Sequence, residues 1–94
     1  MDIRQTGNMV EVDGVIKTIN DSQMLVNAIK DASRNGNVII KINDSFSLPS
    51  TVIGELLKLK DNGVKITLEV KDEILYELLD DLNLVTIFNV KKYQ

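Results

Sequence analysis

Two adjacent hydroxyl residues, Ser50 and Thr51, are the side chains best placed to do chemistry in this chain. They follow Pro49, a residue that favours the first positions of a helix because its φ is already helical. The unpaired N–H groups of a helix start attract either a capping oxygen or an anion. Two interpretations therefore stay open. A hydroxyl of Ser47, Ser50 or Thr51 caps the helix, or a phosphate carrying about −1.5 to −2 charges is added there.

The residues that other catalytic mechanisms need are missing from the sequence. The 94 residues include no His and no Cys, so the commonest general base and two common metal ligands are missing. The five glycines are scattered and form no phosphate-binding loop. Five Asp residues stand at predicted turns or caps, where binding to the local backbone explains them: Asp13, Asp21, Asp44, Asp61 and Asp72. We therefore expect no enzyme activity, no cofactor and no metal site.

Composition restricts the partner classes. The net charge is −3 and Lys and Arg do not cluster, so the basic surface needed for direct nucleic-acid binding is missing. Apolar runs fall far short of the roughly 20 residues that span a bilayer, and the first residues lack the apolar core of a signal peptide. We expect a cytoplasmic protein without direct membrane insertion, with a single domain over residues 1–90 and a loose tail over 91–94.

The elements around the hydroxyls are a buried strand and an amphipathic helix. Residues 38–42 are β-branched and apolar, as in a central strand, and residues 43–45 end it with turn-forming side chains. The helix that follows Pro49 ends at residues 61–63. Upstream, the pattern predicts strands at 2–5 and 9–12 and a helix at 21–34, with Asn20 as its cap.

The rest of the chain predicts the fold class. Residues 64–70 alternate strictly, so one sheet face is wet and the helices crowd onto the other. Asp72 caps a third helix ending near Leu82, and residues 84–90 form a short strand or a docked coil. The order β-β-α-β-α-β-α indicates an α/β (α+β) fold, with one mixed sheet of four to five strands against about three helices. Aromatic residues are few, so the core is expected to be aliphatic.

Three stretches resemble the STAS family, the sulfate-transporter and anti-sigma-factor-antagonist domain, over nearly the whole chain. They are Gly14 with the helix opening Asn20-Asp21-Ser22, the segment VIIKINDSFSLPSTVIGELLKL, and the ending LYELLDDLNLVTIFNV. Antagonist members carry Asp-Ser-Ser-Gly in the central loop, and a partner kinase phosphorylates the first serine. Alignment through Gly54 sets Pro49 at the Asp, Ser50 and Thr51 at the serines, and Val52 at the glycine.

The resemblance implies a non-enzymatic regulatory module of transcription. Such a module binds a kinase-type anti-sigma factor or related switch protein through residues 47–54 and is controlled by phosphorylation at Ser50. The alternative is a constitutive, unphosphorylated accessory subunit of a membrane-lipid transporter ATPase. In both cases Leu48 and Val52 are expected to be exposed apolar contacts, with Val52 adding bulk where a partner approaches. The predicted partner-binding residues are Asn20, Asp21, Asp44, Ser47, Leu48, Pro49, Val52 and Gly54.

Overall fold

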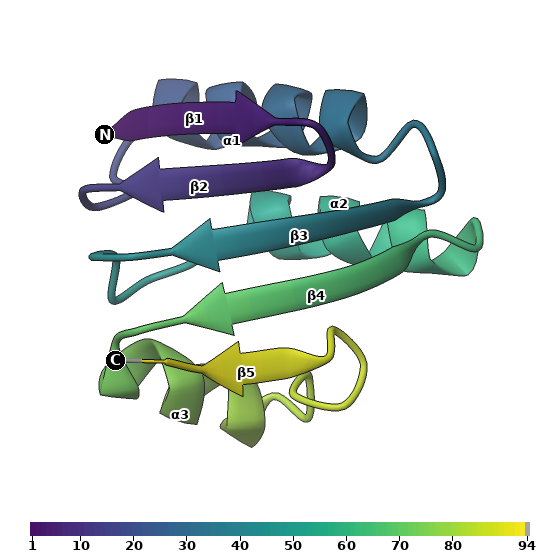
Figure 1. The fold of residues 1–94 in the computed structure, drawn as a ribbon. Helices are drawn as coiled ribbons and strands as arrows, with labels where there is room; N and C mark the ends of the chain where they lie inside the picture. Colours follow the sequence, from purple (N-terminus) through teal and green to yellow (C-terminus); the bar gives the residue numbers. More distant parts are fainter. Residues whose placement is uncertain (94) are drawn as a thin grey trace.

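A single mixed sheet backed by three helices makes up the computed structural model, which describes residues 1–93 (Figure 1). The elements are β1 (Asp2–Thr6), β2 (Met9–Asp13), α1 (Ile19–Ala32), β3 (Asn37–Ile42), α2 (Ser50–Asp61), β4 (Lys65–Val70), α3 (Glu73–Asp81) and β5 (Val90–Lys92). The strands lie in chain order; β1 is antiparallel to β2, and every later pair is parallel. The predicted α/β class is confirmed, and the element order ends in a fifth strand, β5.

All three helices cover the same face of the sheet, as the alternation in residues 64–70 predicts (Figure 1). In β3 and β4 every second side chain is buried beneath the helices, and the residues between them are partly or fully exposed. The buried hydrophobic side chains are aliphatic apart from Phe88, which is fully buried. The expected aliphatic core is therefore confirmed, with one aromatic ring in it.

The opposite, open face of the sheet carries a row of charges that alternate in sign. The strand register places Arg4 beside Glu11, Glu11 beside Lys41, Lys41 beside Glu69, and Glu69 beside Lys91. We call these five residues the charged row. Opposite charges on neighbouring strands attract, whereas like charges there would destabilise the pairing. The charged row therefore keeps this face hydrated and favours the observed register.

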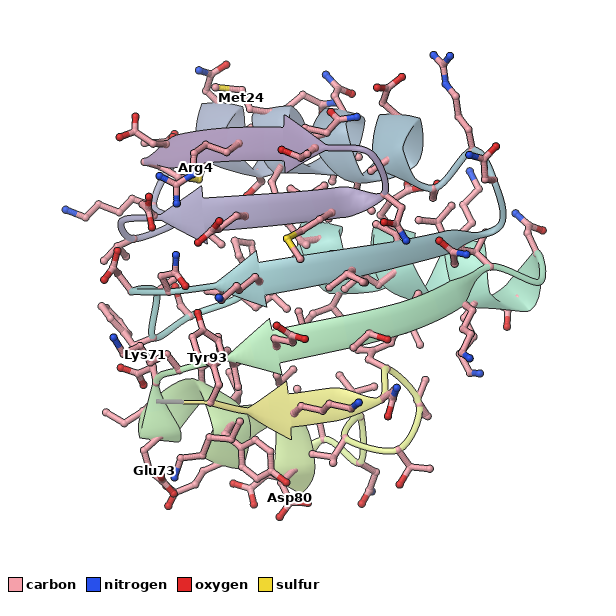
Figure 2. All side chains as sticks on the ribbon, viewed as in Figure 1. Arg4, Met24, Lys71, Glu73, Asp80 and Tyr93 are labelled. Atoms are coloured by element: carbon pink, nitrogen blue, oxygen red, sulfur yellow. The ribbon has the colours of Figure 1, made fainter. Side chains whose placement is uncertain are left out.

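A polar network at one end of the charged row joins the first strands to the last. The Arg4 guanidinium lies 3.1 Å from Glu11 and 2.9 Å from Asp13. The Asn43 amide donates to both carboxylates, and the Tyr93 hydroxyl donates to the Asn43 side-chain oxygen. Figure 2 shows the Tyr93 ring on the open face at the ends of the strands. The hydrogen bond from Asn43, followed by the charge of Arg4, holds the pKa of Glu11 below its usual value.

The predicted loose tail is wrong for Lys91, Lys92 and Tyr93. Lys91 and Lys92 belong to β5, and the Tyr93 amide donates to the Val70 carbonyl at 3.0 Å. The Tyr93 ring also lies 4.7 Å from the Lys41 ammonium. Residue 94, the end of the predicted tail, lies outside the described residues. Within 84–90, turns precede β5, which starts at Val90.

The start of α1 also differs from the prediction. Its N-cap is Thr18, not Asn20, and Thr18 and Asp21 form a reciprocal capping box. The Thr18 hydroxyl accepts from the Asp21 N–H at 2.9 Å, and the Asp21 carboxylate accepts from the Thr18 N–H at 3.2 Å. The helix therefore begins two residues earlier than Asn20 and Gln23 had indicated, and it ends at Ala32. No helix within residues 1–93 is both long and apolar enough to cross a bilayer.

The polar network predicts an unusual titration of Tyr93. Burial, followed by the nearby Glu11 carboxylate, raises the pKa of the phenol from 10.0 to about 12. The pKa of Tyr93 is higher in the folded than in the unfolded chain, so the protonated phenol contributes to the free energy of unfolding. This contribution is complete below pH 10 and is lost as the pH rises through about 12. The tyrosinate absorbance of the wild type minus that of Tyr93→Phe should have its midpoint near 12. A midpoint at the ordinary value, with circular dichroism still native, would contradict the network.

Candidate functional site

The predicted hydroxyl pair lies at the first turn of α2, on exposed residues. Ser50 and Thr51 are the first two residues of the helix, and Pro49 is its N-cap. Within residues 1–93, no side chain caps α2, and its first turn carries no acidic residue. The capping interpretation is therefore wrong for Ser47, Ser50 and Thr51. Ser50 and Thr51 are exposed beside a helix start that has no side-chain acceptor.

The loop before α2, residues 43–49, is anchored by the buried side chain of Ser45. The Ser45 hydroxyl donates to the Ser47 carbonyl at 2.7 Å and accepts from the Ile16 amide at 3.3 Å. The Ser47 hydroxyl donates to the Ile16 carbonyl at 3.4 Å. These bonds join the loop after β3 to residues 14–18, the loop after β2. Ser47, a predicted partner contact, therefore also holds the two loops together.

Leu48 and Val52 are buried, so the prediction that they form an exposed apolar contact is wrong. Both side chains belong to the core cluster beneath the sheet. The bulk of Val52 is therefore directed into the core, away from any partner that approaches the helix from solvent. Of the neighbouring predicted contacts, Pro49 is half-buried and Gly54 is exposed.

Two apolar side chains that the sequence analysis missed are exposed in this part of the molecule. Ile19, the first residue of α1, is 91% exposed, and Phe46, in the loop before α2, is 53% exposed. An aromatic residue between polar loop residues was the available signal for Phe46. For Ile19 the signal was the capping box of Thr18 and Asp21, which makes the residue directly after Thr18 the first of the helix.

A shallow hollow of about 200 Å³ lies between the starts of α1 and α2. Its lining is Lys17, Thr18, Ile19, Ser22, Gln23, Pro49 and Thr51. The volume falls below the roughly 300–1,000 Å³ of typical small-molecule sites, so a protein surface suits this hollow better than an enclosed ligand. Within residues 1–93, no three His, Cys, Asp or Glu side chains gather as a metal site requires.

The acidic and amide residues predicted to contact a partner are already bonded locally. The Asp21 carboxylate accepts from the Lys17 and Thr18 amides, and these bonds hold its pKa below the usual value. Asp44 accepts from the Gly14 amide at 2.8 Å. Asn20 is exposed, and its amide lies 3.7 Å from the Met24 sulfur. Asp21 and Asp44 thus stabilise the two loops beside the hydroxyl pair.

Gly54 has no structural reason to be a glycine. It lies inside α2, its φ is not positive, and an added Cβ would meet no described atom within 4 Å. A glycine inside a helix costs about 0.5–1 kcal/mol relative to alanine. Gly54 is four residues after Ser50, so the two lie on the same side of the helix. The helix is therefore bare of a side chain at Gly54, one turn after the exposed Ser50.

No protein-family model and no curated protein matches the chain. The resemblance to the STAS family therefore stays a prediction from the three quoted stretches.

The different caps of α1 and α2 predict different responses to the same mutation. Thr18→Ala removes a side-chain cap and should lower the free energy of unfolding by about 0.5–2 kcal/mol. Ser50→Ala removes a hydroxyl that caps nothing and should change it by less than about 0.5 kcal/mol. Urea denaturation of both variants beside the wild type measures the difference. Equal losses would show that Ser50 caps α2 in solution.

Proposed function

We propose that this protein is a non-enzymatic regulatory module that binds a protein partner through residues 47–54, the 47–54 surface. In this proposal it acts as an anti-sigma factor antagonist does, and Ser50 is its phosphorylation site. The observation that carries the proposal is the uncapped start of α2, where the Ser50 hydroxyl is exposed and makes no capping bond. A hydroxyl with no role in the fold at a helix start is available to a kinase.

The chemistry of a phosphate at this position supports a switch in binding. The free N–H groups and the partial positive charge of a helix start stabilise an anion, so phosphorylation would leave α2 intact. The added charge of about −1.5 to −2 would instead change the surface presented to the partner. Ile19 and Phe46 offer exposed apolar area close to the two bonded loops. A partner fitted to the neutral surface would have to desolvate the phosphate and would bind less tightly.

Phosphorylation is tested with the kinase-type anti-sigma factor of the same cells and ATP. Intact-mass spectrometry should show the gain of one phosphate, which Ser50→Ala abolishes. Fragmentation would assign the position, and Thr51→Ala serves as the matched control at the neighbouring exposed hydroxyl. No gain of mass, or a gain that persists when both residues are replaced, would refute the switch.

Gly54 provides a second test, which separates stability from binding. Gly54→Ala should raise the free energy of unfolding by about 0.5–1 kcal/mol, because the added methyl group meets no neighbour. The same methyl group should weaken binding of the anti-sigma factor, measured by calorimetry, because it stands where a partner approaches the bare helix.

The control for Gly54 is Asn27→Ala, an exposed replacement on α1 that also raises helix propensity. It should leave the affinity for the anti-sigma factor unchanged. Gly54→Ala binding as tightly as Asn27→Ala would rule out the 47–54 surface as the interface.

One observation favours the alternative, a constitutive accessory subunit of a membrane-lipid transporter ATPase. Pro49 occupies the position of the family's acidic residue, and Asp44, the nearest carboxylate before it in the sequence, is bonded to the Gly14 amide. Ser50 therefore has no adjacent acidic residue to orient its hydroxyl. Capture from native lysate distinguishes the two classes: an ATPase subunit favours the alternative, and a kinase-fold protein favours the switch.

A further inference from the structure

Helix α3 carries a second apolar face besides the one that it buries. Leu75 and Leu79 are fully buried against the sheet. Ile74, Leu78 and Leu82 are 65%, 39% and 50% exposed. These three follow one another at intervals of four residues and so form a continuous strip along the helix and its C-cap. Single exposed apolar residues need no explanation, but a continuous strip indicates an interaction surface.

The exposed strip of α3 faces α2. Glu73 pairs with Lys92 of β5, and Figure 2 shows Glu73 and Asp80 on the side of α3 away from α2. Successive residues of a helix are about 100° apart, so Leu78, two positions before Asp80, lies on nearly the opposite side. Leu82, two positions after Asp80, lies there too.

Helix α2 presents an apolar side chain toward α3. Glu55 of α2 lies 3.8 Å from Lys30 of α1, which fixes the side of α2 that faces α1. Leu57, two positions later, lies on nearly the opposite side and is partly exposed. Within residues 1–93, α1 and α2 bring Cα atoms within 8 Å of each other, whereas α2 and α3 do not. Leu57 and the strip therefore turn apolar side chains toward the same side of the molecule, between α2 and α3.

The charges beside the strip are acidic. Helix α3 carries Glu73, Glu77, Asp80 and Asp81 and no basic residue. Glu77 and Asp81 border the strip on its solvent side. Asp80 and Asp81 also stand at the negative end of the helix dipole, where an acidic residue is unfavourable. On the α2 side, Lys58 and Lys60 are basic and Asp61 is acidic, so the acidic charge beside the strip comes from α3 alone.

We propose that Leu57, Ile74, Leu78 and Leu82, the α2–α3 surface, bind an amphipathic helix of a partner protein whose apolar face is bordered by Lys and Arg. The apolar face of such a helix covers the strip, and its basic residues pair with Glu77 and Asp81. A second copy of this chain fits worse, because two α3 helices would bring like charges together. Leu57 is three residues after Gly54, so this surface adjoins the 47–54 surface along α2. Its apolar strip lies on α3, and its use does not depend on phosphorylation of Ser50.

The probe is a synthetic helical peptide of about four turns, made of Leu at helical spacing with Lys on the remaining positions. It is titrated into the isotope-labelled full chain and followed by amide chemical shifts. We expect the largest shifts at Leu57, Leu78 and Leu82 and around them. Leu78→Ser should weaken binding about tenfold or more, because one buried leucine contact is lost. Ile19→Ser replaces a still more exposed apolar side chain, at the start of α1, and should leave the affinity unchanged.

The charge requirement is tested in the same titration. Replacing Glu77 by Gln and Asp81 by Asn together should weaken binding several-fold at low salt, and a peptide with Glu in place of Lys should bind more weakly still. Binding unaffected by Leu78→Ser, or shifts confined to the charged row, would overturn the proposal. It is equally overturned if the protein forms dimers in sedimentation experiments that Leu78→Ser abolishes, since the occupant would then be a second copy.

Discussion

Burial of one face of a single sheet is the constraint on which the other features of the molecule depend. The inward side chains of β3 and β4 leave water only because every helix lies on the same side of the sheet. Strands β2, β3 and β4 are parallel, so their carboxyl termini lie at the same end of the sheet. The loops that lead to the three helices begin there. The loop that precedes Ser50 therefore neighbours the loop after β2 because of the strand arrangement, not because of any local sequence signal.

At this end of the sheet, the residues that anchor the loop before α2 differ from the residues that the loop exposes to solvent. Ser45, Leu48 and Val52 are buried, while Phe46 and Ser50 face solvent. The buried Ser45 hydroxyl satisfies backbone groups that would otherwise lose their hydrogen bonds to water, at a large cost in free energy. A presented residue can thus be changed with little effect on the fold, whereas a change to Ser45 would separate two loops.

Periodicity predicted the sheet, the helices and the location of the hydroxyl pair, because burial acts on every second strand residue and on one helix side. Periodicity failed for residues whose position depends on a contact with a residue far away in the sequence. Ser45 bonds a residue 29 positions away, and Tyr93 a residue 50 away, and neither spacing leaves a local pattern. Leu48 was misplaced because an apolar loop residue does not reveal which way it points. The start of α1 was misplaced because Thr18 and Asn20 are both good caps, and the reciprocal bond with Asp21 favours Thr18.

The two outer strands limit how another protein can attach. Strand β5 is three residues long and ends in two lysines, and β1 places Asp2 and Arg4 on the other outer edge. Short, charged edge strands resist the addition of a further strand from another chain. Backbone pairing, which is nearly indifferent to sequence, is therefore disfavoured at both edges. A partner has to recognise particular side chains on the loops and helices, so the discrimination between partners rests on a few surface positions.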